Sequence, residues 1–257
     1  MNKNELAALV FVGLLFVGML ASLEIGRRFG RRSDTQQGGK EGLGVIDGAI
    51  FALLGLLIAF TFSGAATRFE GRRHLIVEEA NDIGTAYLRI ELLPAETRPE
   101  IKDLFRRYVD SRLATYQHIS DPSLPRAYLA KSQELQAEIW SQSVAAASQS
   151  SNTAATMLLL PALNSMFDIT TVRTAATEDH PPTVIFGMLA LIALASSMLA
   201  GFEMAGAERR SWLHTVGYAL ILSIAIYVIL DLEYPRLGLI RVDAADHFLV
   251  EVRNSMK

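Results

Sequence analysis

The distribution of apolar residues along the chain predicts four membrane-spanning helices. Asp, Glu, Lys and Arg make up 20% of the 257 residues, yet four windows contain none of them. The windows are Leu6–Leu23, Ala49–Ala66, Pro181–Phe202 and Trp212–Leu230. Each is long enough to cross the hydrocarbon core of a bilayer as an α-helix, which takes roughly 17–25 residues. The pattern therefore predicts an integral membrane protein, with the lipid bilayer as a partner, and argues against a soluble domain.

The first window could also be the apolar core of a secretory signal peptide, because Lys3 precedes it and the small residues Ala21 and Ser22 end it. The apolar core of a signal peptide typically has about 7–15 residues. This window is longer, and Arg27 and Arg28 follow it. We therefore expect a retained transmembrane helix.

The segment between the second and third windows predicts a helical insert. It contains no run in which apolar and polar residues alternate, which would indicate a strand. We expect helices over residues 67–92, 96–119, 126–149 and 153–177. Neither proline nor a glycine pair occurs between Ala66 and His74, so the second span should continue into the first insert helix without a break.

The first insert helix is predicted to be amphipathic. Apolar residues at spacings of three and four form one face, namely Ile76, Ala80, Ile83, Tyr87 and Ile90. The opposite face carries Glu78, Asp82, Thr85 and Arg89. Later in the insert, Asn164, Asp168 and Arg173 predict a buried polar network between helices.

The predicted fold class is an all-α integral membrane protein with four transmembrane helices, two before and two after a helical soluble insert. The expected divisions are residues 1–66 for the first two helices, 67–180 for the insert, 181–230 for the last two helices, and 231–257 for a C-terminal tail. Small residues recur every four positions on two spans, which lets helix backbones approach closely and predicts a tight bundle or an oligomer. They are Gly55, Ala59 and Ser63 on the second span, and Ser196 with Ala200 and Ser197 with Gly201 on the third.

Charge and composition exclude several function classes. The chain has a net charge of −3 and no cysteine, so disulfides and thiolate metal sites are excluded and nucleic acid is not an expected partner. The histidines have no zinc-binding spacing, and no phosphate-binding loop or nucleophile elbow occurs. We therefore predict no enzyme, no cofactor and no metal site. Lys and Arg are balanced on the two sides of the predicted spans, so the positive-inside rule gives no orientation.

The end of the second window resembles the second transmembrane helix of the bestrophin family of ion channels. Its sequence from Leu56 to Arg73 reads LLIAFTFSGAATRFEGRR. As in that family, an apolar helix reaches a Phe, here Phe60, and continues into a Thr-Arg-aromatic step at Thr67-Arg68-Phe69. Over nearly its whole length the chain resembles the bacterial bestrophin-like domain membrane proteins. The matching runs are AFTFSGAATRF, EEANDIGTAYLR, LLLPALNSMFDITTVR and DLEYPRLGLIRV.

The resemblance implies an ion channel in the bacterial inner membrane, with a cytoplasmic insert and inorganic ions as partners. Bestrophins are pentamers in which the second helices line the pore. Carried onto this chain, the pore neck is Ala52, Leu56 and Phe60, which share one helix face and could gate ions by dewetting. The pore mouth and vestibule would be formed by Arg68, Arg72, Arg73, Glu78, Asp82, Thr85 and Arg89.

The residues themselves leave other interpretations open. Leu56 and Phe60 could face lipid or pack between helices, the arginines could reach the lipid headgroups, and the charged face of the insert helix could simply be solvated. The ion selectivity is also open. An alternative function is a non-conducting membrane scaffold or sensor whose large helical insert binds a partner.

Overall fold

The computed structural model describes residues 3–33, 43–117, 123–149, 153–206, 211–236 and 238–256, and in these ranges all regular structure is helical. Four helices are long and apolar enough to cross a membrane, which confirms the predicted fold class at that level. The chain divides into two compact units. The first unit comprises residues 1–68 and 180–240, and the second comprises residues 69–179 and 241–257.

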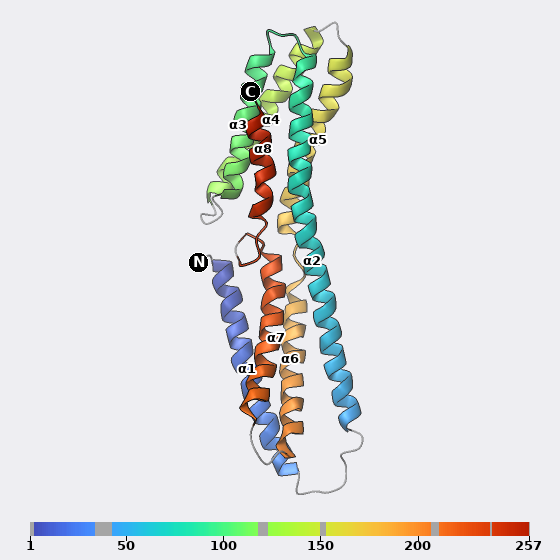
Figure 1. Cartoon of the computed structure of the whole chain (residues 1–257), viewed down its shortest axis with the longest axis vertical. Coiled ribbons are helices and arrows are strands. Elements are labelled where there is room, and N and C mark those ends of the chain that lie inside the picture. The colour runs from blue at the N-terminus through green and yellow to red at the C-terminus, as the bar shows by residue number, and fades with distance from the viewer. Residues whose placement is uncertain are drawn as a thin grey trace. The chain divides into compact units, whose positions relative to one another are not determined.

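The first unit is built from α1 (Lys3–Ser33), the first half of α2 (Leu43–Arg89), α6 (Thr183–Glu203) and α7 (Trp212–Glu233), as Figure 1 shows. A short 3-10 turn, η3 (Met204–Gly206), follows α6. Each helix continues past the C-terminal end of its uncharged window, while α6 begins two residues inside its window. The core of the unit is apolar and contains Leu15, Met19, Leu23, Leu54, Ala193, Ala200, Ala219, Ile226 and Leu230.

Helices α1 and α6 pack with their backbones in direct contact. A Cβ atom added at Gly201 would lie 2.0 Å from the carbonyl oxygen of Leu23, and one added at Gly26 would lie 1.9 Å from that of Met198. Only glycine fits at such distances. The small residues predicted on the third span, including Ser196 and Gly201, are therefore used inside the chain, where they are buried.

The second unit begins with the C-terminal half of α2. It continues through η1 (Ile90–Leu92), α3 (Arg98–Gln117), α4 (Ser123–Gln149), the π-helix η2 (Ala155–Leu159) and α5 (Leu160–Glu178). The C-terminal segment then adds η4 (Asp243–Asp246) and α8 (His247–Ser255). The predicted continuation of the second span is confirmed, since α2 is one unbroken helix.

The predicted apolar face of the insert helix forms the core of the second unit. Ile76, Ala80, Ile83, Tyr87 and Ile90 are all buried, with exposed fractions of 8% or less. Leu104, Phe105 and Tyr108 of α3 and Leu163 of α5 belong to the same core. On the surface, Arg253 of α8 makes two hydrogen bonds to the Asp110 carboxylate of α3, at 2.6 and 3.0 Å. The C-terminal segment, which was expected only as a tail, is thus a packed helix of this unit.

Candidate functional site: the second helix and its polar ends

Helix α2 contacts the rest of the first unit through one narrow seam. Asp47, Leu54 and Ala65 are its buried residues, at 7%, 3% and 0% exposed. Leu54 lies seven residues after Asp47, and Ala65 lies eleven residues after Leu54. Because an α-helix has 3.6 residues per turn, both spacings bring the side chain back to the same side of the helix. Beside this seam, the ring of Phe51 meets that of Tyr218 of α7 edge-on, with centroids 6.4 Å apart.

The predicted neck residues lie on the opposite side of α2. Leu56 and Phe60 are 52% and 67% exposed, and Ala52 is also exposed. Leu56 is two residues from the buried Leu54, which turns it about 200° around the helix. The face formed by Ala52, Leu56 and Phe60 therefore points away from the unit to which α2 belongs.

A second set of residues on this outward side is small. Gly55, Ala59 and Ser63 are exposed and lie next to the neck residues on the helix surface. A Cβ atom added at Gly55 would meet nothing within 4 Å, unlike one added at Gly201. Among the described residues, the predicted packing stripe is therefore open at Gly55 and exposed at Ala59 and Ser63.

The first of the three predicted pore-mouth arginines is bound at the end of α7. Arg68 donates to the Glu233 carboxylate, with the shortest distance, 2.5 Å, from Nη2 to Oε1. The Glu233 side chain is 1% exposed, and Nδ1 of His180 lies 3.6 Å from its Oε2. The His180 ring also stacks beside that of Tyr234, with centroids 4.8 Å apart. The charge of Arg68 is thus neutralised inside the first unit.

The other two arginines have different partners, both in the second unit. Arg72 is buried and donates to the carbonyl oxygens of Ala176 and Asp179 at 2.9 and 2.8 Å. These carbonyls lie at the C-terminal end of α5, where a cation is favourable because the helix dipole is negative there. Arg73 pairs with the exposed Glu70 at 3.0 Å. The three arginines thus have separate partners.

The predicted vestibule residues follow the solvent-facing side of α2 in the second unit. Glu78 and Thr85 are exposed and Asp82 is half-buried. Burial, and then the negative charges of Glu78 and Glu79, raise the pKa of Asp82 above its usual value. Arg89 donates to the carbonyl oxygen of Leu158 at 2.7 Å. This face carries charge of both signs and is predominantly acidic.

The residue that sequence reasoning missed is Glu79. It is fully buried in the second unit, where its carboxylate accepts hydrogen bonds from Arg112 Nε of α3 at 2.5 Å and from Arg173 Nη1 of α5. Burial alone would raise the pKa of Glu79, but the guanidinium groups of Arg173 and Arg112 hold it below its usual value. The signal was present in the sequence, since Glu79 lies three residues after Ile76 and four before Ile83, on the apolar face.

The predicted polar network on the last insert helix is correct for only one of its three residues. Arg173 is buried and pairs with Glu79. Asn164 and Asp168 are exposed, which corrects that part of the prediction. Arg173 lies nine residues after Asn164 and five after Asp168, so it occupies a different face of α5.

The DLEYPRLG run contains a second structural carboxylate. Asp231, near the end of α7, accepts hydrogen bonds from the backbone N–H groups of Leu239 at 3.0 Å and Ile240 at 2.7 Å. A Cβ atom at Gly238 would lie 1.6 Å from the Asp231 carboxylate. Gly238 therefore lets the chain turn closely around this side chain after the membrane-spanning helix.

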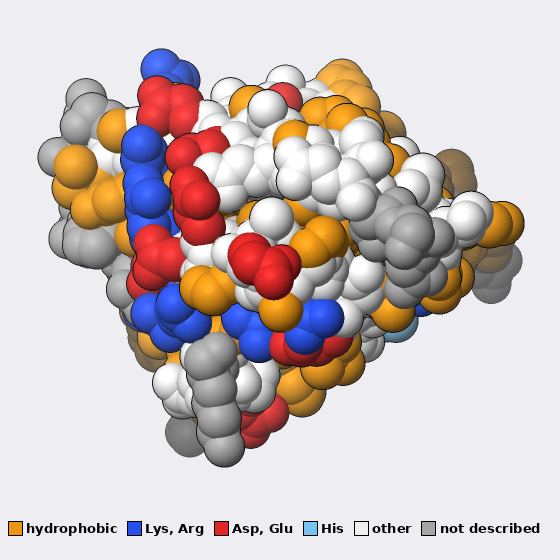
Figure 2. Space-filling view, turned by 90° about the horizontal axis from the view of Figure 1, so that it is seen from above, with side chains coloured by type: hydrophobic (Ala, Val, Ile, Leu, Met, Phe, Trp, Pro, Cys, Tyr) orange, Lys and Arg blue, Asp and Glu red, His pale blue; other side chains and the backbone are white. Residues whose placement is uncertain are grey.

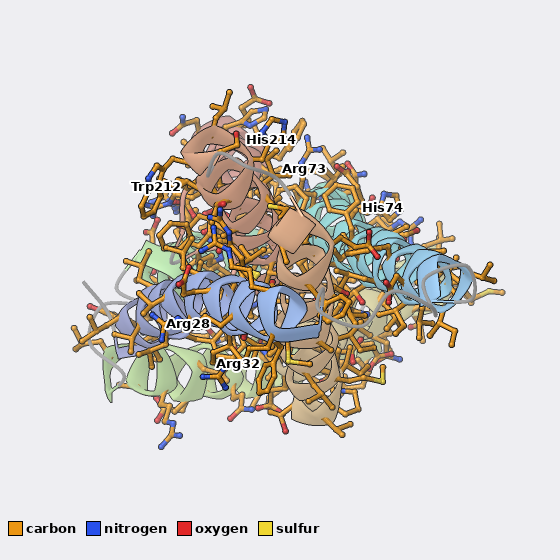
Figure 3. All side chains as sticks on the ribbon, turned by 90° about the horizontal axis from the view of Figure 1, so that it is seen from below. Arg28, Arg32, Arg73, His74, Trp212 and His214 are labelled. Carbon is orange, nitrogen blue, oxygen red and sulfur yellow. The ribbon has the colours of Figure 1, made fainter. Side chains whose placement is uncertain are left out.

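One end of the first unit carries the side chains expected at a membrane surface. Arg28 and Arg32 project from the last turns of α1, and Trp212 and His214 from the first turn of α7, as labelled in Figure 3. His214 is exposed, and its Nδ1 lies 2.5 Å from the hydroxyl of Ser211. Arginine and tryptophan are both typical of the headgroup region.

An open hollow in the second unit was also a possible binding site. It is lined by Glu91, Ala95, Arg98, Pro99, Lys102 and Arg106. Glu91 pairs with Lys102 at 2.6 Å and with Arg98 at 2.7 Å, while Arg106 lies 3.6 Å from Asp103. Figure 2 likewise shows Lys and Arg side chains beside Asp and Glu on one face of the molecule. Each cation of the hollow has a carboxylate partner, so we place no ligand there.

Comparisons with known proteins agree with the geometry of the membrane helices. The family model of the Bestrophin-like domain matches residues 10–246, which include most of the first apolar helix and the whole of the other three. No curated protein and no solved structure matches the chain. Among the described residues, no group of three or more His, Cys, Asp or Glu side chains is placed to hold a metal ion.

Proposed function

The chain belongs to the family of the bestrophin-like domain, and from this premise we propose that it is an oligomeric ion channel whose pore is lined by α2. Family membership and the four apolar helices make it a membrane protein. The proposal adds conduction, the pore helix and the oligomer.

The observation that carries the proposal is the outward face of α2. Helix α2 keeps a narrow inward seam and leaves Leu56 and Phe60 more than half exposed, on the side turned away from its own unit. In a ring of chains with α2 on the inside, the face turned away from each chain's own unit is the one that faces the central axis. The outward face of α2 would then line the pore.

The composition of that face fits both roles that a pore helix must fill. Gly55, Ala59 and Ser63 are small enough to let neighbouring α2 helices approach closely. Leu56 and Phe60, one turn apart, would form successive apolar rings that gate ions by dewetting. At the third neck position, Ala52 has a smaller side chain, so the pore would be wider there than at Leu56 and Phe60. The rings are uncharged, so they restrict passage without choosing the sign of the ion.

We assign the remaining features on the same premise. The oligomer is a pentamer in the bacterial inner membrane, and residues 67–180 form an insert on the cytoplasmic side. The acidic side of α2, with Glu78, Asp82 and Thr85, lies on the ion path beyond the neck. Arg68 and Arg72 hold the helix ends near the mouth through Glu233 and the α5 carbonyls, so they act as positioning residues more than as anion attractors.

The first test is the subunit count. The full chain is purified in nanodiscs and measured by mass photometry and native mass spectrometry. We expect a single species of five chains. A monomer or dimer would contradict the proposal, because it leaves no central pore lined by repeated α2 helices, and would favour the scaffold or sensor function.

The second test is conduction through planar bilayers. Replacing Phe60 with alanine should increase the current, because removing a ring of aromatic side chains widens the constriction and makes it easier to hydrate. Phe62→Ala is the matched control, since Phe62 lies on the same helix and is 45% exposed but points about 200° away from Phe60. Equal currents from the two variants, or no current from any form, would overturn the pore assignment.

A further inference from the structure

The buried cluster around Glu79 carries more positive than negative charge. Two guanidinium groups, of Arg112 and Arg173, share one carboxylate. All three side chains are inside the second unit, with exposed fractions of 0% for Glu79, 0% for Arg112 and 5% for Arg173. The cluster thus holds one positive charge in excess, and a buried charge without a counter-charge is strongly unfavourable.

One donor of this cluster is also without an acceptor. Arg112 uses Nε for Glu79 and donates from Nη2 to the Tyr116 hydroxyl at 2.5 Å. Its Nη1 is buried and has no hydrogen-bond partner among the described residues. Buried arginine nitrogens are normally satisfied, so both the excess charge and the open donor require an acceptor that this part of the chain does not supply.

The neighbouring titratable groups do not provide the missing negative charge. Tyr108 accepts from Gln136 at 3.2 Å and lies at the same distance from the Thr170 hydroxyl. Burial raises the pKa of Tyr108 to about 12, so its hydroxyl stays neutral at physiological pH. Asp82 is only half-buried, burial and the charges of Glu78 and Glu79 raise its pKa, and among the described residues it forms no ion pair with Arg112 or Arg173.

We propose that the second unit binds one small monovalent inorganic anion, such as chloride or bromide, at Nη1 of Arg112. The anion would accept hydrogen bonds from the N–H groups of this nitrogen. Its negative charge would cancel the excess positive charge of the Arg112–Glu79–Arg173 cluster. Its size is limited because the cluster is closed to solvent on nearly all sides. Tyr116 is half-buried, and its ring centroid lies 4.1 Å from Cζ of Arg173 and 5.2 Å from Cζ of Arg112. It therefore marks the side from which the anion enters.

The site is distinct from the proposed neck, because every residue of the site belongs to the second unit and Ala52, Leu56 and Phe60 belong to the first. It would make the stability of that unit depend on the halide concentration, whether or not the chain conducts. A bound water would satisfy the open donor equally well but would leave the charge uncompensated. A stability that depends on which anion is present therefore distinguishes a bound halide from a bound water.

The test is thermal unfolding of the detergent-purified full chain in sodium chloride, sodium bromide or sodium gluconate at equal ionic strength. Binding to the folded state alone should raise the Tm with halide concentration, as mass action requires, and gluconate is too large to replace the halide. The line width of the ³⁵Cl NMR signal, with bromide as competitor, measures chloride binding directly.

Arg112→Gln is the decisive variant. It leaves one carboxylate and one guanidinium, Glu79 with Arg173, so the buried cluster stays balanced and the chain should fold. It should weaken halide binding about tenfold or more, the loss expected from removing a hydrogen bond to an ion. Arg106→Gln on the same helix is the control and should bind as the unchanged chain does.

Two results would overturn the proposal. One is a Tm that is the same in all three salts together with no chloride-dependent broadening, which would leave water as the ligand. The other is halide binding of undiminished strength in Arg112→Gln, which would place the anion elsewhere, for example in the pore. If Arg112→Gln does not fold, the ³⁵Cl signal of the unchanged chain and of Phe60→Ala still decides whether a halide site exists apart from the neck.

Discussion

Replacing Gly201 with alanine tests whether direct backbone contact between α1 and α6 holds the first unit together. A Cβ atom at this position would lie 2.0 Å from the carbonyl oxygen of Leu23 and 2.7 Å from its carbonyl carbon. Both obstructing atoms are backbone atoms, so they cannot rotate away as the end of a flexible side chain could. The added methyl group must therefore push the two helices apart.

The size of the effect follows from these distances. Ordinary van der Waals contact begins at 3.4 Å, so the helices must separate locally by about 1.4 Å, the difference between 3.4 and 2.0 Å. A gap of 0.5–1 Å already removes about a quarter to a half of each pairwise attraction. Overpacked positions typically lose about 1–3 kcal/mol. For a chain of this size that corresponds to a decrease in Tm of about 2–4 °C per kcal/mol.

The assay is thermal unfolding of the detergent-purified protein, followed by intrinsic tryptophan fluorescence. Gly187→Ala is the matched control, because Gly187 is also in α6 and a Cβ atom there meets nothing within 4 Å. Alanine is the better helix former by about 0.8–1.0 kcal/mol in water, so the control should unfold at the same temperature or higher. If both variants unfold at the temperature of the unchanged chain, the direct contact of α1 with α6 is not what stabilises the unit.

Two further predictions concern the structural carboxylates. Glu79→Gln should lower the free energy of unfolding by about 3–5 kcal/mol in denaturant titrations, because it removes the one carboxylate that two buried guanidinium groups share, whereas the exposed Glu78→Gln should change little. Since the pKa of Glu79 is below its usual value of 4.5 in the folded state, its contribution is present above that pH and should be lost as the pH falls further. Gly238→Ala should displace the Asp231 carboxylate from the Leu239 N–H group, lower stability by about 1–3 kcal/mol, and speed tryptic cleavage after Arg236; unchanged cleavage would contradict the proposed turn.

The helices were predictable from the sequence because their signals are local. An uncharged window long enough to cross a bilayer is visible in one stretch of sequence. The same holds for the apolar face of the insert helix, which Ile76, Ile83 and Ile90 mark within a few turns. Helix α8 was not predicted, because its nine residues have no long apolar run and their packing depends on α3, more than a hundred positions earlier. A short helix held by distant contacts leaves little trace in a local pattern.

The partners of the charged residues were harder to predict than their positions. Arg68 is bound to Glu233, which is 165 residues away, and Arg72 to carbonyls more than a hundred residues away. Nothing in the local sequence distinguishes such an arginine from Arg73, which pairs with Glu70 one turn away. Glu79 was different: its position on the apolar face predicts burial, and a buried carboxylate requires cationic partners. The sequence thus indicates that Glu79 is buried beside cations, but it does not show that those cations are Arg112 and Arg173.

The small residues of the membrane helices fall into two groups, and the difference bears on assembly. Those at the α1–α6 contact, such as Gly26 and Gly201, have neighbouring backbone within 2.0 Å of a hypothetical Cβ atom, so they are fully used inside one chain. A Cβ atom added at Gly55 would instead meet nothing within 4 Å. Glycine inside a helix costs stability unless close packing requires it. At α1–α6 that packing is supplied by the chain itself. In the proposed oligomer it would be supplied at Gly55 by a second copy of α2, and because Leu56 and Phe60 share the exposed side of α2 with Gly55, one such contact would account for the small and the bulky residues together.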